Sequence, residues 1–235
     1  MLRFWGQPKF SREPLEPIGY ELFLREYNTG NWEIPTDFSK FTATQITDLL
    51  TRTTPEFPQK MKHISINLDI DQFVDPVFLQ AFFAIKQQLS GIQLSIELTE
   101  RTGQLNISPS QLVTAAKRFN DAGFYIILDD VSSGDNQLAR VKLLNDFVHE
   151  YKFAIQNFRP FESLEDIVPN LTFWRDLAQK NQKLFTIEGV ESKQDLLILS
   201  HYQADMFQGY ALGRPIYLPT QDDPDSVISE STTCY

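Results

Sequence analysis

Phe124-Tyr-Ile-Ile-Leu-Asp-Asp130 is an unbroken apolar run that ends in two adjacent carboxylates, and it decides the fold. A run without polar alternation is typical of a strand buried on both faces, as in a parallel sheet. Parallel α/β folds bind ligands at the carboxyl ends of their strands, so Asp129 and Asp130 indicate a cation site there. The alternative is one Asp that caps a helix or turn while its neighbour is solvated, and this stretch alone favours that plainer interpretation.

Strand and helix patterns alternate on both sides of this stretch. We expect eight strands, at 2–10, 18–25, 62–68, 92–98, 124–130, 148–155, 184–187 and 205–211. We expect about six helices, at 44–52, after Asp75-Pro76, at 108–122, 138–144 and 164–180, and after the capping box Ser192-Lys-Gln-Asp195. Residues 11–17 are too few for a crossover helix, so the first two strands should pair antiparallel. The alternation favours a closed β/α barrel over a sandwich or a bundle.

Composition is consistent with one large α/β domain. The chain has 235 residues, 42% of them hydrophobic, which is enough for one barrel at 1–218. The remaining stretch, 219–235, is a polar tail whose composition is compatible with disorder. No apolar run approaches the roughly 20 residues of a membrane helix, and no signal sequence is visible, so we expect a soluble, cytoplasmic protein.

Charge and residue usage exclude several functions. The formal net charge of −10 disfavours binding to DNA, RNA or an anionic membrane. His63, His149 and His201 are widely spaced, which disfavours a histidine-based zinc site. The single cysteine, Cys234, offers neither a disulfide framework nor a thiolate metal site.

Polar residues recur late in the predicted strands. They are Glu21, Asn67, Glu97, Asp129 with Asp130, Lys152, Glu188 and Gln208. In a barrel these strand ends converge on one face, where clustered carboxylates need compensating cations, and their oxygens suit Mg²⁺ or Mn²⁺. Two such ions would lower the pKa of a water and promote hydrolysis of a phosphodiester. Lys152 would orient that water or stabilise charge on the phosphate; a solvated lysine at a strand end is the alternative.

The same residues resemble a known family, the EAL domain of cyclic di-GMP phosphodiesterases. The matching stretches follow in the family's order: Gln7-Pro8, Gly19-Tyr-Glu-Leu-Phe-Leu-Arg25, Ile66-Asn67, Glu97-Leu-Thr-Glu100, Leu128-Asp-Asp130, Lys152, Glu188-Gly-Val-Glu191 and Gln208-Gly-Tyr-Ala-Leu-Gly-Arg-Pro215. Each match is weak alone. Eight in register, across nearly the whole chain, form a specific signature.

The resemblance implies a fold, an activity and a set of site residues. The fold would be a modified TIM barrel whose first strand runs against the others. The activity would be hydrolysis of the bacterial second messenger cyclic di-GMP to linear pGpG, with a water activated by two divalent cations, Mg²⁺ or Mn²⁺. Isolated domains of this family often dimerise, so a homodimer is a candidate assembly, although no interface is visible in the sequence.

The resemblance also assigns roles by position. Metal ligands would be Glu21, Asn67, Glu97, Asp129, Asp130 and Glu188, and the catalytic residues Lys152 and Glu21. The substrate-binding positions of the family match Gln7, Arg25 and Gln208. Glu100 matches the acid that anchors the loop after the paired aspartates, and Glu191 matches a supporting acid.

Three departures from the family pattern leave alternatives open. Glu21-Leu-Phe replaces Glu-Ala-Leu, Val131-Ser-Ser-Gly134 replaces Phe-Gly-Thr-Gly, and Lys152-Phe-Ala154 replaces Lys-Ile-Asp. The last change removes a carboxylate from the region of the metals or substrate. The second hypothesis is therefore a catalytically impaired module that binds cyclic di-GMP or a protein partner as a regulator. A third is a barrel hydrolase that acts on another phosphodiester.

Overall fold

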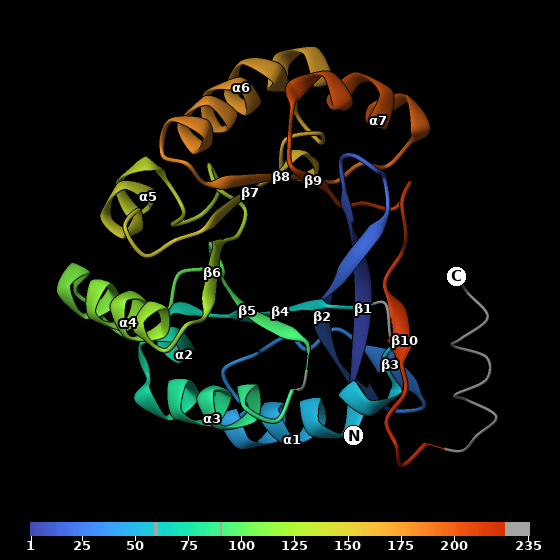
Figure 1. Cartoon of the computed structure of the whole chain (residues 1–235), viewed down its shortest axis with the longest axis vertical. Helices are drawn as coiled ribbons and strands as arrows, with labels where there is room; N and C mark the ends of the chain where they lie inside the picture. The colour runs from blue at the N-terminus through green and yellow to red at the C-terminus, as the bar shows by residue number, and fades with distance from the viewer. Residues whose placement is uncertain (59–60, 90, 224–235) are drawn as a thin grey trace.

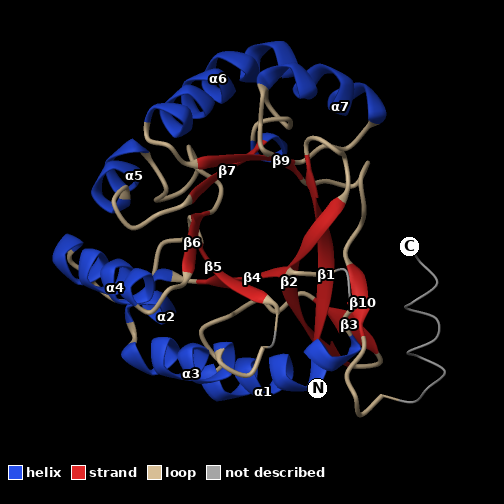
Figure 2. Ribbon diagram, viewed as in Figure 1, coloured by secondary structure: helices blue, strands red, loops and turns tan. Residues whose placement is uncertain are grey.

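Ten strands of the described residues form one sheet that closes on itself. The computed structural model describes residues 1–58, 61–89 and 91–223. The strand order is β10-β1-β9-β8-β7-β6-β5-β4-β2-β3, and β1 also pairs with β2, which closes a ring of the strands other than β3 and β10. Helices surround this ring on the outside (Figure 1 and Figure 2).

The elements of the described residues have the following bounds. The strands are β1 (Leu2–Ser11), β2 (Pro17–Asn28), β3 (Asn31–Glu33), β4 (His63–Leu68), β5 (Gln93–Leu98), β6 (Tyr125–Leu128), β7 (Glu150–Ala154), β8 (Leu184–Glu188), β9 (Met206–Phe207) and β10 (Ile216–Leu218). The helices are α1 (Ala43–Thr53), α2 (Ile70–Val74), α3 (Pro76–Lys86), α4 (Pro109–Asp121), α5 (Leu138–Leu144), α6 (Leu164–Lys180) and α7 (Lys193–Leu199), with 3₁₀ turns η1 (Thr54–Glu56), η2 (Ile155–Asn157) and η3 (Ser200–Tyr202).

The predicted barrel with an antiparallel first strand is confirmed. β1 pairs antiparallel with both β2 and β9, whereas β2, β4, β5, β6, β7, β8 and β9 run parallel to one another. The β1–β2 register places Gln7 opposite Glu21. Because β1 is antiparallel, its later residues enter the barrel at the end where the other strands begin.

Local signals in the sequence explain where the helices begin. Asp75 accepts a hydrogen bond from the Val77 N–H at 2.9 Å, and Pro76 follows as the first helical residue of α3. The predicted box before α7 is present, because the Asp195 N–H donates to Ser192 Oγ at 3.0 Å. These caps satisfy backbone groups that would otherwise lack partners.

Three short elements were not predicted. They are α2, β3 and β10, each three to five residues long. Segments this short carry almost no periodic signal. β10 lies between two prolines and exists through its pairing with β1, where Gly6 is opposite Ile216. The last predicted strand, 205–211, was too long: β9 ends at Phe207, and Gly209 then turns with a φ of 155°.

Side chains alternate between the two faces of the barrel wall. On β4, Ile64, Ile66 and Leu68 belong to the hydrophobic core packed beneath the helices, whereas Ser65 and Asn67 line cavities inside the barrel. The apolar core therefore lies between the strands and the helices. This leaves positions inside the barrel for polar groups.

The contacts of the barrel extend past the predicted boundary at residue 218. Arg3 Nη2 lies 2.8 Å from Asp223 Oδ1, and the Tyr217 hydroxyl and the Thr220 N–H each donate to Asp223 Oδ2 at 2.8 Å. Burial opposes ionisation, but the hydrogen bonds from Arg3 and Thr220 outweigh it and lower the pKa of Asp223 to about 2. The rest of the predicted tail, 224–235, lies outside the described residues.

Asp223→Ala should lower the free energy of unfolding by about 1–3 kcal/mol at pH 7, because it leaves Arg3 and Tyr217 without their shared acceptor. The folded-state pKa is below the ordinary value, so this stabilisation is complete above about pH 4 and is lost as the pH falls through about 2. Urea unfolding at several pH values measures the difference between the two proteins.

Asp222→Ala is the matched control. Asp222 is more exposed and pairs with Arg52, 3.2 Å away, so its substitution should lower the free energy of unfolding by less than about 0.5 kcal/mol. Equal effects of the two substitutions would contradict the anchoring role of Asp223.

Candidate metal centre and active site

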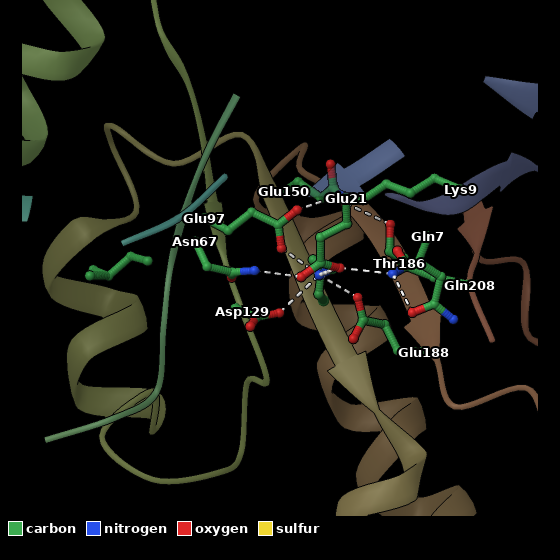
Figure 3. Close-up of polar contacts among 12 residues, drawn as sticks. Gln7, Lys9, Glu21, Asn67, Glu97, Asp129, Glu150, Thr186, Glu188 and Gln208 are labelled. Carbon is green, nitrogen blue, oxygen red and sulfur yellow. Dashed lines mark hydrogen bonds and ion pairs between the residues drawn. The ribbon is translucent and has the colours of Figure 1, made fainter. Parts of the chain in front are cut away.

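The polar residues predicted to meet at one face do meet there. They come from different strands: Gln7 from β1, Glu21 from β2, Asn67 from β4, Glu97 from β5, Lys152 from β7 and Glu188 from β8, with Asp129 directly after β6 and Gln208 directly after β9 (Figure 3). Asn67, Glu97 and Glu188 are late in their parallel strands, and Asp129 and Gln208 follow theirs, so the cluster lies toward the carboxyl end of the barrel.

Lys152 is the centre of this cluster. Its ammonium is buried with 0% side-chain exposure and lies 3.0 Å from Glu21 Oε2 and 2.9 Å from Asp129 Oδ1. It also forms ion pairs with Glu97 and Glu188. One cation therefore holds carboxylates from four strand ends together.

The cluster shifts the ionisation of its members in opposite directions. Burial disfavours the charged form of Lys152, but the attraction of Asp129, Glu188, Glu21 and Glu97 outweighs burial and raises the pKa of Lys152 well above its ordinary value. Burial, and repulsion from neighbouring acids, raise the pKa of Glu188 to about 8 despite Lys152. One ammonium is thus too little positive charge for all of these acids.

Glu97 has a second cation, Lys9, which the sequence analysis did not identify. Lys9 Nζ lies 2.6 Å from Glu97 Oε1, and both side chains are almost fully buried. Burial alone would raise the pKa of Glu97, but Lys152 and Lys9 together lower it to about 2. The signal in the sequence that could have identified Lys9 is the period-two alternation of side chains along β1, which places Lys9 on the same face as Gln7.

Amide side chains hold Glu21 in place. Asn67 Nδ2 donates to Glu21 Oε1 at 2.7 Å, and Gln208 Nε2 donates to Glu21 Oε2 at 2.8 Å. Gln208 Nε2 also lies 3.3 Å from Gln7 Oε1, and Gln7 Nε2 donates to the Gly213 carbonyl. These bonds fix the carboxylate plane of Glu21 toward the cluster.

Asp130 lies at the edge of the cluster. Its backbone has a φ of 47°, outside the extended region, two residues after β6 ends at Leu128. Carboxylate oxygens of Glu100, Asp129 and Asp130 all lie within 4.8 Å of one another. Burial is the main cause that raises the pKa of Asp130 to about 6, and Glu100 adds to it.

The residues fit divalent cations. Oxygens of Glu21, Glu97 and Glu188 form a second group in which all atoms lie within 4.8 Å of one another. Within the described residues, the buried atoms Asn67 Oδ1 and Gln208 Oε1 have no hydrogen-bond partner. Oxygens left unpartnered beside several carboxylates are the ligands that Mg²⁺ and Mn²⁺ prefer.

A cleft of about 320 Å³ lies over these acids. Its floor includes Glu21, Asn67, Asp129, Asp130 and Glu188, and its walls include Phe23, Arg25, Ile34, Phe38 and Arg101. The Arg101 guanidinium lies 4.7 Å from the centre of the Phe38 ring and donates through Nε to Asp69 at 2.7 Å. The cleft therefore joins an anionic, oxygen-rich floor to an aromatic and cationic wall.

Glu100 and Glu191 lie around the cluster rather than at its centre. The Glu100 carbonyl accepts from the Asp135 N–H at 2.7 Å, which ties this backbone to the loop after Asp130. Glu191 is half exposed and pairs with Arg159 at 3.2 Å. The roles assigned to both acids stay predictions.

The loop at 131–134 keeps a tight turn despite its unusual sequence. Ser132 has a φ of 78°, a region where a non-glycine residue costs roughly 1 kcal/mol. Gly134 packs so closely that an added Cβ would lie 2.3 Å from the Glu100 carbonyl oxygen. Ser132 Oγ accepts from Asn170 Nδ2 at 3.0 Å, which offsets part of the strain.

Fold and site together define a barrel protein with a buried acidic cluster suited to divalent cations. The EAL domain family matches the chain over residues 2–215. The chain therefore belongs to the EAL domain family.

Two curated relatives come from Escherichia coli (strain K12). The probable cyclic di-GMP phosphodiesterase PdeN is 26% identical over 229 residues, which cover 90% of this chain and 43% of that protein. The probable cyclic di-GMP phosphodiesterase PdeG is 28% identical over 160 residues, which cover 66% of this chain and 30% of that protein. The chain spans less than half the length of both relatives.

Solved structures support the fold. The PaMucR phosphodiesterase in complex with c-di-GMP matches with a TM-score of 0.75 and 21% identity, over 92% of each chain. The Bacillus subtilis YkuI protein, with an EAL domain and in complex with c-di-GMP and calcium, matches with a TM-score of 0.73 and 20% identity, over 99% of this chain and 60% of that chain.

Lys152→Met should destabilise the metal-free protein by about 3–5 kcal/mol, because it leaves buried carboxylates without their shared cation. Urea unfolding in the presence of a chelator measures the change, and added Mn²⁺ should restore part of the loss. Lys142→Met, on an exposed face of α5, is the control and should change stability by less than about 0.5 kcal/mol. A similar small effect at both positions would mean that Lys152 does not hold the cluster together.

Proposed function

We propose that this EAL domain hydrolyses cyclic di-GMP to linear pGpG and depends on two divalent cations, Mg²⁺ or Mn²⁺. The observation that carries the proposal is the cluster in which Glu21, Glu97, Asp129 and Glu188 surround one buried lysine. The family membership supports cyclic di-GMP as the substrate, as does the similarity to the probable cyclic di-GMP phosphodiesterase PdeN.

The residues that would hold the cations are the six predicted from the sequence, Glu21, Asn67, Glu97, Asp129, Asp130 and Glu188. Bound divalent cations lower the pKa of a water and stabilise charge on the attacking and leaving oxygens of a phosphodiester. The carboxylates supply the negative charge that retains such cations, and Asn67 adds a neutral oxygen without further repulsion.

Lys152 contributes a fixed positive charge at the reaction centre. Its pKa is raised well above the ordinary value, so its ammonium stays protonated at neutral pH. Lys152 donates to Glu21, Glu97 and Asp129 in this structure. With cations bound to these acids, an N–H group of Lys152 would be released to orient a water beside the scissile phosphate and to offset negative charge that develops on the phosphate oxygens. Because Lys152 is fully buried, this charge acts where bulk water does not screen it.

The cleft explains how a dinucleotide would bind. Its acidic floor and cations would face the phosphates, while Phe23, Ile34 and Phe38 offer apolar walls for the bases. Arg25 and Gln7 line the same cleft and can donate hydrogen bonds to phosphate or base oxygens.

The proposal also includes a homodimer and a cytoplasmic location for the protein. No helix among the described residues is long and apolar enough to cross a membrane.

A second candidate function is a catalytically impaired module that binds cyclic di-GMP or a protein partner. The observation in its favour is Ala154, which is 1% exposed and lies opposite Glu188 in the β7–β8 register. This position carries Asp in the family pattern, so a carboxylate is missing beside a proposed ligand. The strained Ser132 in the neighbouring loop points in the same direction.

The direct assay is conversion of cyclic di-GMP to pGpG with Mg²⁺ or Mn²⁺, followed by chromatography. Glu21→Gln should lower kcat by roughly 100-fold, the loss typical when one strong electrostatic group leaves an active site. Glu33→Gln, at an exposed position of β3, should leave the rate unchanged.

The other functions predict other outcomes in this assay. Tight cyclic di-GMP binding without pGpG would contradict the enzyme and favour the binding module. Turnover of another diester that cyclic di-GMP does not inhibit at low concentration would favour a hydrolase of different specificity.

Ala154→Asp should raise the metal-dependent rate several-fold, because a carboxylate beside Glu188 strengthens retention of a second cation. Steady-state rates over a Mn²⁺ titration measure this, with the unfolding temperature as a check on folding. Ala139→Asp, at an exposed position of α5, controls for added charge. A folded Ala154→Asp protein with an unchanged rate would show that the missing carboxylate does not limit turnover.

A further inference from the structure

The barrel interior is not filled at the end opposite the acidic cluster. A cavity of about 310 Å³ lies where the parallel strands begin and the antiparallel β1 ends. Its lining comes from β1, β2 and β4 to β9 and includes Lys9, Gly19, Ser65, Ser95, Glu150 and Met206. Barrels of this class usually fill this region with layers of large branched side chains.

Small residues create the space. Gly19, Ser65 and Ser95 occupy inward positions on neighbouring strands, where β4 pairs Ser65 with Ser95. Gly19 allows no larger side chain, because an added Cβ would lie 2.5 Å from the His63 carbonyl oxygen. At the rim, His63, Gln93 and Leu184 are exposed, so the cavity opens to solvent.

The inner end of the cavity carries polar groups suited to a ligand. Ser65 is 3% exposed, and its hydroxyl has no hydrogen-bond partner in the part of the chain that the structure describes. Lys9 Nζ carries three hydrogens and donates one of them to Glu97. Glu150 is also 3% exposed and accepts from the Thr186 hydroxyl at 2.7 Å through one of its two oxygens. Donors and an acceptor are therefore aimed into one space.

The charges and the apolar side chains that line the cavity indicate what kind of ligand fits it. Lys9 and Glu150 line the same cavity with opposite charges, so an ionic ligand of either sign would face a like charge. A neutral group with an adjacent donor and acceptor can satisfy both residues. The walls at Ile18, Ile127, Leu184 and Met206 are apolar and suit a ring.

We propose that this cavity is a second binding site, for a small uncharged heterocycle that bears an amide edge. The amide oxygen accepts from Lys9 or Ser65, and the amide N–H donates to Glu150. The site is separate from the proposed active site and does not depend on that function. Lys9 contacts both, since it also pairs with Glu97, so occupancy of the cavity and of the acidic cluster should influence each other.

Three probes with one pyridine ring test the proposal: nicotinamide is neutral, nicotinate is an anion and 3-picolylamine is a cation. Saturation-transfer NMR titrations of the full chain should give a Kd of about 1 mM for nicotinamide, the range expected for so small a ligand. Both charged probes should bind at least about 10-fold more weakly, because each buries a charge beside a like charge.

Variants locate the binding. Ser65→Ala should weaken nicotinamide about 3–10-fold by removing one hydrogen bond, and Ser95→Leu should abolish binding by filling the cavity. Ser110→Leu, in an outer groove between α2, α3 and α4, is the control and should leave binding unchanged. Unfolding temperatures identify any variant that does not fold, and Ser65→Ala keeps the test available if Ser95→Leu fails.

Three results would overturn the proposal. They are no nicotinamide signal above a reference protein, binding that persists in folded Ser95→Leu, and equal affinities for the neutral and charged probes. Crystals soaked in nicotinamide that show only water in the cavity would also refute it.

Discussion

The structure depends on a charge constraint at Lys152. Four carboxylates from different strand ends converge on its ammonium, and each would be costly to bury alone. The barrel brings them together because side chains that face inward from neighbouring parallel strands converge at one end of it. Lys9 pairs with Glu97, and the amides of Asn67 and Gln208 donate to Glu21, which compensates part of this charge.

This constraint links folding to chemistry. Burial, together with repulsion from neighbouring acids, raises the pKa of Glu188 to about 8 and that of Asp130 to about 6, so additional positive charge would favour the ionised form of both. A site with unsatisfied negative charge and unpartnered oxygens is suited to divalent cations. The features that cost stability in the protein alone are therefore the features that the proposed function requires.

Much of the fold was accessible from the sequence. The apolar run before Asp129, and the capping signals at Asp75 and Ser192, located a strand and two helices. β10 was not accessible, because three residues between prolines become a strand only when β1 lies beside them. Local patterns carry no information on such pairing.

The sequence predicted which polar side chains lie together but not their electrostatics, and their roles in metal binding and catalysis stay predictions. The order of strand-end acids, and the family resemblance, identified the residues that now lie together. Lys9 was missed, because a lysine on a strand is usually solvated and only tertiary structure shows it buried against Glu97. The position of Lys152 among four acids likewise depends on distances that no linear spacing contains.

The most direct test of the central claim is anomalous diffraction from crystals soaked with Mn²⁺ and cyclic di-GMP. The account predicts Mn²⁺ peaks within ligand distance of Glu21, Asn67, Glu97, Asp129, Asp130 and Glu188, with the substrate phosphate next to Lys152. Bound cyclic di-GMP with no Mn²⁺ peak at these residues, and with Lys152 still paired to the acids, would contradict it.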